Sequence, residues 1–134
     1  MLILRDDLET LLAQHSDPDA MPIRMLYRFD PLLLGNRNRK WIINPADEVR
    51  VSRIAGHIEG IVLDRGRIVA TWRYVRKGKG LVITVEPFGK LRAHVQRKLP
   101  KLAERVARYF RVPLQEFAFG EDTTIYPGRG RARK

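Results

Sequence analysis

Cysteine is absent from this 134-residue chain, which excludes disulfides, thiolate nucleophiles and cysteine-bound zinc. The three histidines, His15, His57 and His94, lie too far apart in the sequence to indicate a metal site. Apolar runs stay well short of the roughly 20 residues that a membrane span needs, and Asp6 and Asp7 make the amino-terminal segment too acidic for a signal peptide. The sequence predicts a soluble cytoplasmic protein that needs no metal and no cofactor.

Acidic residues are scarce in the middle of the chain. Residues 31–111 contain 19 Lys and Arg against 6 Asp and Glu, whereas residues 1–30 carry a net charge of −3. The whole chain has a formal net charge of +11 at pH 7. So many like charges repel one another in a compact domain and attract polyanions, of which nucleic acids are the most common. The charge therefore indicates a nucleic-acid partner.

Glycine marks the turns of a predicted β-meander. Apolar and β-branched segments at 58–63, 68–75 and 81–86 are joined by short basic loops that contain Gly66 and Gly78. Glycine permits the positive φ angles of tight hairpin turns, so the three segments are expected to form two antiparallel hairpins. Every second residue of the third segment is apolar, which predicts one packed and one partly wet face of the sheet.

One helix is expected before this meander in the sequence and another after it. Apolar residues recur at helical spacing from Leu91 to Phe110 and form a sustained stripe. Pro100 lies within the stripe and is expected to kink the helix or split it in two. A further strand is expected at 114–119, and the leucines of residues 4–12 share one face of a short helix.

The expected fold class is α+β. It consists of an antiparallel β-meander or small, partly closed barrel, with a C-terminal helix packed on it and a short N-terminal helix. We divide the chain into an N-terminal helix and linker (residues 1–20), an α+β basic core domain (21–119) and a flexible basic tail (120–134).

Three clusters of basic residues are candidates for phosphate contacts. They lie in the 37–40 loop, in the 73–79 hairpin and along the 97–108 part of the helix. Their members are Arg37, Arg39, Lys40, Arg73, Arg76, Lys77, Lys79, Arg97, Lys101, Arg105 and Arg108. Each cluster alone also fits an ordinary solvated turn or helix face. Because Glu104 is the single acidic residue of the helical segment, ion pairs within that segment cannot neutralise it, which favours an external partner.

Trp41 directly follows the first of these clusters. An aromatic ring beside arginine can stack on an unpaired base. Large aromatic side chains more often supply the apolar packing of a domain. We therefore expect Trp41 in the core.

No residue pattern identifies a catalytic group. His57 and Glu59 match the first half of a zinc deaminase motif, but that motif also requires two cysteines. The Gly-Lys-Gly at 78–80 lacks the length and context of a phosphate-binding P-loop. We expect no catalytic residue in this chain.

Three pieces of sequence occur in an informative order. Residues 28–35 read RFDPLLLG and are followed by RNR at 37–39, residues 55–59 read AGHIE and lead to GRIVATWR at 66–73, and residues 85–88 read VEPF before the helix. Together, over about residues 23–118, they resemble the C-terminal region of the bacterial winged-helix DNA-binding family that includes the AlkZ-like DNA glycosylases.

The resemblance implies a β-rich part beside tandem winged-helix units, a hairpin that contacts double-stranded DNA, and excision of alkylated or crosslinked bases by the studied members. It also implies a catalytic Gln–apolar–Gln or Gln–apolar–Asp triplet. This chain has only Gln14, Gln96 and Gln115, none of them in such a triplet. The chain is much shorter than the usual members and is expected to lack their first winged helices, which a protein partner could supply.

These observations predict non-catalytic binding of double-stranded DNA through basic hairpin, loop and helix contacts to phosphates. Three alternatives stay open on the sequence. The chain could be a divergent DNA glycosylase that needs a partner chain, an RNA-binding module, or an interaction domain for an acidic protein. The sequence does not define the oligomeric state.

Overall fold

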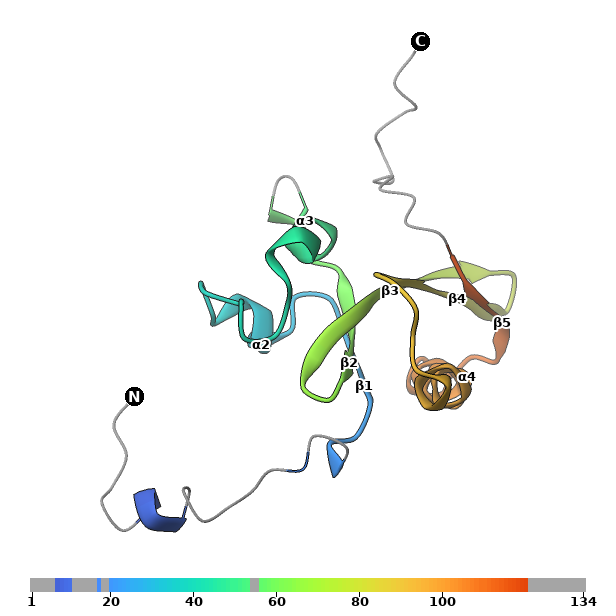
Figure 1. Ribbon diagram of the computed structural model, residues 1–134. Helices are drawn as coiled ribbons and strands as arrows, with labels where there is room; N and C mark the ends of the chain where they lie inside the picture. Colours follow the sequence, from blue (N-terminus) through green and yellow to red (C-terminus); the bar gives the residue numbers. More distant parts are fainter. Residues whose placement is uncertain (1–6, 11–16, 18–19, 54–55, 121–134) are drawn as a thin grey trace.

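The computed structural model describes residues 7–10, 17, 20–53 and 56–120 and has a mixed α+β fold (Figure 1). Its single sheet has five strands that lie side by side in sequence order. The strands are β1 (Arg24–Leu26), β2 (Gly60–Asp64), β3 (Arg67–Lys77), β4 (Gly80–Pro87) and β5 (Leu114–Phe119). Strands β1 and β5 form its two edges, so the sheet is open and the barrel alternative is wrong.

The predicted meander is confirmed, since β2, β3 and β4 pair antiparallel through two tight turns. The first turn places Arg65 and Gly66 at positive φ, 52° and 72°, which is the requirement of a two-residue type I′ hairpin. The second turn has Gly78 at a φ of 59°. β5 pairs parallel with β4 because a long helix crosses over between them.

That helix is α4 (Ala93–Tyr109), which packs on the sheet as expected. It is one continuous element through Pro100, so the alternative that Pro100 splits the helix is wrong, while a kink at Pro100 stays a prediction. Proline costs about 3 kcal/mol in a helix interior. Burial of the apolar face offsets this cost, because Val95 and Leu99 are fully covered by the sheet residues.

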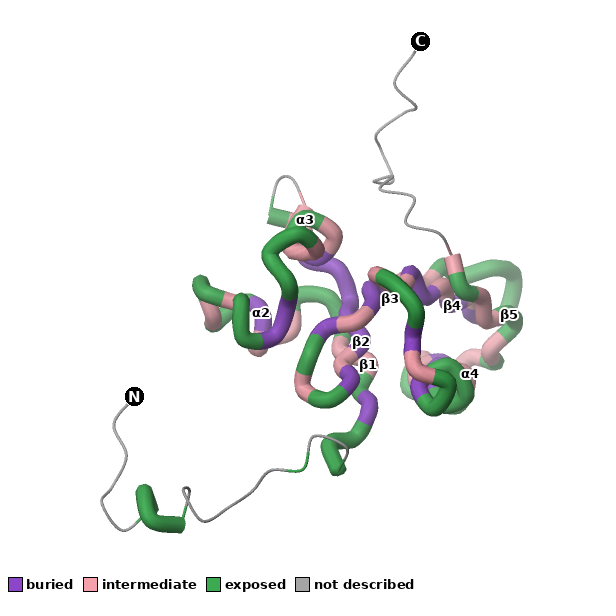
Figure 2. The backbone as a smooth tube through the Cα atoms, viewed as in Figure 1, coloured by how far each residue is buried: buried purple, intermediate pink, exposed green. Residues whose placement is uncertain are grey.

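Both faces of the sheet are packed. On the α4 face, Leu81, Ile83 and Val85 of β4 meet the apolar side of the helix, as the alternation in the sequence predicts. The opposite face is covered near β2 by α2 (Pro31–Leu34), α3 (Glu48–Val51) and the segment between them. This second cluster contains Leu33, Ile42, Ile43, Val51, Ile58, Ile61 and Ile68. Figure 2 shows the buried positions running along the strands, with exposed residues on the outer side of α4.

A bulge in β3 turns Ile68 and Ala70, which are two positions apart, to opposite faces of the sheet. Val62 pairs with Ala70, whereas the next residue, Leu63, pairs with Ile68, so Val69 is the extra residue. Ala70 consequently faces α4, while Ile68 packs in the cluster of α2 and α3.

The amino-terminal helix is described for residues 7–10, which are helical, with Leu8 exposed. The remaining leucines of the predicted 4–12 face, and the predicted tail beyond Gly120, lie outside the described residues. Among the helices of the described ranges, none has the length and apolar character to cross a membrane. The domain boundaries at residues 20 and 119 stay a prediction.

An ion pair joins the start of α4 to the end of β2. The Arg92 guanidinium donates from Nε and Nη2 to both oxygens of Asp64, at 2.9 and 2.6 Å. Asp64 is buried, and its bond to Arg92 lowers the pKa of the Asp64 carboxyl below its usual range. The charged form of Asp64 is therefore the form that the fold stabilises.

We expect Asp64→Asn to lower the free energy of unfolding by about 1–2 kcal/mol at neutral pH. Because the pKa of Asp64 is lowered by folding, its contribution is complete above the unfolded value of about 4 and is lost as the pH falls through the folded value. Urea unfolding of both proteins at pH 7 and at about pH 3 measures this. If the difference in the free energy of unfolding between the wild type and Asp64→Asn is the same at both pH values, the charged form of Asp64 does not stabilise the fold.

Candidate nucleic-acid interface

The outer face of α4 carries a row of exposed basic side chains. Arg97, Lys101, Arg105 and Arg108 are all exposed, and their spacing of 4, 4 and 3 residues places them on one side of the helix. This side lies opposite the buried apolar stripe. Glu104 is the only acidic residue of α4. The predicted helix cluster is thus a continuous positive face, pointing away from the sheet.

The predicted hairpin cluster is divided by the alternation of β3. Arg76 lies on the α4 side, where its guanidinium carbon is 5.7 Å from the centre of the Phe110 ring. Lys77 and Lys79 are exposed at the tip of the β3–β4 hairpin. Arg73 lies three residues away on the opposite face of the sheet. Of these two arginines, Arg76 therefore lies on the same face of the sheet as α4, and Arg73 does not.

Arg73 takes part in an internal network of charges. Its Nη2 lies 3.3 Å from Oε2 of buried Glu86 and 3.8 Å from Oε1 of Glu59. Glu59 also lies 3.6 Å from Nε of Arg53 and 3.7 Å from Nε2 of His57. The side chain of Arg73 is 29% exposed, so most of its charge is matched within the fold.

The loop cluster is also divided. The Arg39 side chain is only 15% exposed and donates to Oε1 of Glu48 at 2.7 Å and to the hydroxyl of Ser52. It fastens the loop to α3. Arg37 and Lys40 are exposed and stay available to solvent. Arg39 therefore has a structural explanation that does not involve DNA.

Trp41 is 55% exposed, so the expectation that it lies in the core is wrong. The adjacent Ile42 and Ile43 occupy the core positions instead, each with an exposed fraction of 1%. The Trp41 ring is held on the surface by a bond of 3.0 Å from Nε1 to the carbonyl of Asn38.

An aromatic cluster that the sequence did not reveal lies between β1, β3 and α4. Tyr27 stacks with Tyr74 at 6.1 Å between ring centres, and Tyr74 lies 4.8 Å from Phe110. Trp72 lies 6.1 Å from Tyr27 on the inner side, and Tyr109 meets Phe110 edge-on at 5.5 Å on the outer side. The cluster runs from the buried core to the surface.

The hydroxyls of Tyr27 and Tyr74 are hydrogen-bonded at 2.8 Å. This bond lowers the pKa of Tyr27 and raises the pKa of Tyr74. Either hydroxyl can be the donor in this bond. The Arg28 guanidinium, 5.6 Å from the centre of the Tyr27 ring, also lowers the pKa of Tyr27. The pair is fixed in orientation by this bond.

A groove of about 500 Å³ opens beside this cluster, between β1 and α4. Trp72 lines it from β3, Tyr27 from the position directly after β1, and Tyr109 from α4. Arg24 and Arg105 are exposed at its walls. The described residues that line it include no acidic side chain.

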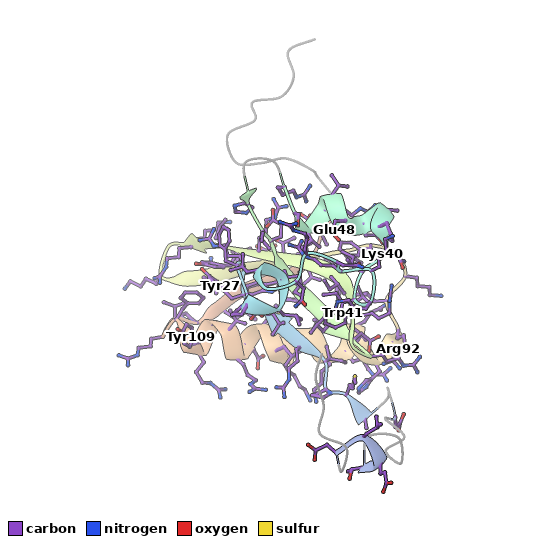
Figure 3. All side chains as sticks on the ribbon, turned by 90° about the vertical axis from the view of Figure 1, so that its left-hand side faces the viewer. Tyr27, Lys40, Trp41, Glu48, Arg92 and Tyr109 are labelled. Atoms are coloured by element: carbon purple, nitrogen blue, oxygen red, sulfur yellow. The ribbon has the colours of Figure 1, made fainter. Side chains whose placement is uncertain are left out.

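Exposed arginines and lysines lie on β1 and the residues after it, at the β3–β4 hairpin and on α4, and two of them, Arg24 and Arg105, line the groove. We call this set the groove-side surface, and its members are Arg24, Arg28, Arg76, Lys77, Lys79, Arg97, Lys101, Arg105 and Arg108. In Figure 3, Tyr27 and Tyr109 lie together at one end of the view, whereas Lys40, Trp41 and Arg92 lie toward the other end. Lys40 of the loop cluster therefore lies apart from Tyr27 and Tyr109 of the groove.

Sequence reasoning missed Arg24, Arg28 and the exposed tyrosines of the groove. A signal for them exists, because residues 23–29 place two arginines around Tyr27 with no acidic residue. Within the described ranges, no group of three His, Asp or Glu side chains is close enough to hold a metal ion. The arrangement is suited to binding an anion with aromatic parts.

Comparison with known proteins gives a family and a similar solved structure. The sequence matches the protein-family model described as DNA glycosylase AlkZ-like over residues 2–109. No curated protein sequence matches the chain. The chain is similar to a solved structure of the Streptomyces sahachiroi DNA glycosylase AlkZ, with a TM-score of 0.66 and 30% sequence identity. That similarity covers 88% of this chain and 30% of the AlkZ chain, so this chain spans less than a third of that protein's length. The expectation that it corresponds to a C-terminal region stays a prediction.

Proposed function

The chain belongs to the AlkZ-like DNA glycosylase family, and we propose on this basis that it binds double-stranded DNA through the groove-side surface. The observation that carries the proposal is the outer face of α4, which presents a row of four exposed basic residues. The whole helix contains a single acidic residue, Glu104. Arginine and lysine bind phosphates without reading the base sequence, so contacts of this kind provide affinity and position rather than sequence preference.

The proposed contacts follow from how each side chain is used in the fold. The α4 row, Arg76 and the lysines of the hairpin tip are exposed to solvent, and Arg105 of the row also lines the groove. Arg39 and Arg73 are engaged by internal carboxylates, so we assign them to the fold and not to the DNA. Arg37 and Lys40 are exposed but do not line the groove, and we propose a secondary role for them.

We further propose that this chain does not itself remove a base. None of its three glutamines belongs to a Gln–apolar–Gln or Gln–apolar–Asp triplet. Gln96 is used within α4, where its Nε2 donates to the carbonyl of Leu91 at 3.0 Å. Activity would then require residues outside this chain, such as those of a protein partner.

We expect the affinity for duplex DNA to fall roughly a thousandfold between about 50 and 200 mM salt, because about six phosphate contacts each release a counterion. Titration of a labelled duplex, followed by fluorescence anisotropy at several salt concentrations, measures this. Structured RNA added as a competitor at equal salt should displace the duplex poorly. Absence of binding at low salt would overturn the proposal. Preferential binding of RNA would show that RNA, and not DNA, is the partner. Release of a base from an alkylated duplex would overturn the proposal that the chain is non-catalytic.

A further inference from the structure

We propose that the groove between β1 and α4 binds a single unpaired nucleobase of the DNA, with the neighbouring phosphates on Arg24 and Arg105. This inference rests on the proposed function and deepens it, since it assigns a ligand to one part of the groove-side surface. It predicts that the protein prefers duplex DNA that contains an unpaired base over fully paired DNA.

The base of the groove is rigid. Trp72 is 3% exposed, and its Nε1 donates to the carbonyl of Leu26 at 2.8 Å, which fixes the plane of the indole. Tyr27 is held by its bond to Tyr74. A groove of about 500 Å³ also lies within the range of roughly 300–1,000 Å³ that is typical of small-ligand sites. The site therefore exists before a ligand arrives.

The outer wall of the groove is an exposed aromatic ring. Tyr109 is 84% exposed and touches Phe110 edge-on, which leaves the faces of the Tyr109 ring largely in solvent. An exposed aromatic face is unfavourable in water, and nucleobases stack on such faces whatever their identity. Tyr109 can thus stack on a base without rearrangement of the core.

The charge of the groove selects among possible occupants. Arg24 and Arg105 stand on opposite walls, one from β1 and one from α4, and the described lining includes no acidic residue. An apolar peptide would leave both guanidinium groups without a partner. A nucleotide supplies both a flat aromatic body for the tyrosines and an anionic phosphate for the arginines. The combination favours a nucleotide over an apolar peptide.

The ring faces of a base in intact duplex are covered by the bases above and below it. Only an unpaired or extruded base can place a face against Tyr27 or Tyr109. The exposed basic row of α4 leads away from the groove and can hold the flanking duplex. An unpaired base next to duplex DNA therefore satisfies both parts of the surface.

The test compares two probes, a fully matched duplex and the same duplex with one unpaired 2-aminopurine. We expect the second probe to bind about tenfold more tightly, which corresponds to roughly 1.4 kcal/mol and lies within the range of base–aromatic stacking. We also expect the 2-aminopurine fluorescence to fall on binding. Tyr109→Ala should lose both the tenfold preference and the fluorescence change, while its affinity for the matched duplex stays the same. Tyr109→Phe keeps the ring and should keep both effects.

The two proposals fail in different ways. Equal affinity for the two probes, with unchanged 2-aminopurine fluorescence, would overturn the base site and leave duplex binding intact. An equal loss of affinity for both probes in Tyr109→Ala would also overturn it, because the ring would then serve general binding. If neither probe binds at low salt, the proposed function itself is wrong, and the base site with it.

Discussion

Removal of three charges from the outer face of α4 is expected to weaken duplex DNA binding roughly several hundredfold at about 0.1 M salt. The variant is Arg97→Gln, Lys101→Gln and Arg108→Gln, which avoids the groove residue Arg105. Each phosphate contact that releases a counterion contributes about eightfold at this salt concentration, and three such contacts multiply. Glutamine is a good helix former, and the buried face of α4 is unchanged, so the fold should persist. Fluorescence anisotropy with a labelled duplex gives the affinities, and circular dichroism checks the fold.

A control variant with the same net charge shows whether the affinity depends on this surface or only on the total charge. Arg37→Gln, Lys40→Gln and Lys90→Gln removes the same number of positive charges from exposed residues that do not belong to α4. We expect this variant to lose less than about tenfold in affinity, since long-range attraction is screened beyond roughly 10 Å at 0.1 M salt. If the control loses as much as the α4 variant, the binding reflects total charge and not the proposed surface.

Replacement of Trp72 with alanine is expected to lower the free energy of unfolding by about 3–5 kcal/mol, as for other buried aromatic residues. Trp72 packs in the cluster beneath α4 and also holds edge strand β1 through its bond to the carbonyl of Leu26. The neighbouring backbone is shaped to the indole, because a Cβ at Gly60 would lie 2.8 Å from Nε1 of Trp72. Urea unfolding monitored by circular dichroism measures the loss.

Trp72→Phe is the matched variant. It retains an aromatic ring and much of the packing but leaves the carbonyl of Leu26 without its indole donor, so we expect a smaller loss of about 1–2 kcal/mol. A Trp72→Ala protein that unfolds at the same urea concentration as the wild type would show that the indole does not support the core. Equal losses in the two variants would assign the effect to the hydrogen bond and not to packing.

The meander could be predicted from the sequence because its signals are local. Gly66 and Gly78 sit where the chain needs positive φ, and the alternation along 81–86 continues through consecutive residues. The register of the pairs is less local. The bulge at Val69 and the parallel pairing of β5 depend on how β2, β4 and α4 pack, so neither can be read from a single segment.

The candidate site was less predictable because its residues come together only in the fold. Tyr27 and Tyr74 are 47 positions apart, and Phe110 comes from a third element. The same reason explains Arg39 and Arg73, whose carboxylate partners lie 9 and 13 positions away. A count of basic residues cannot distinguish a charge that is matched inside the fold from one that faces solvent.

The failure at Trp41 has a related cause. A tryptophan beside two isoleucines has the composition of a core segment, but three consecutive residues cannot all face the same interior. Ile42 and Ile43 are buried, and the chain turns so that the Trp41 ring lies on the surface. The tendency of large aromatic residues to pack in a core predicted the position of Trp41, whereas the direction of each side chain depends on the local turn.

The central claim is that side chains on the outer face of α4 bind DNA phosphates, and the salt dependence of binding tests it most directly. The slope of log affinity against log salt concentration counts the phosphates that are neutralised. We predict that the slope for Arg97→Gln, Lys101→Gln, Arg108→Gln is shallower than that of the wild type by about 2.7, or 0.9 for each lost contact. Identical slopes for the two proteins would contradict the claim.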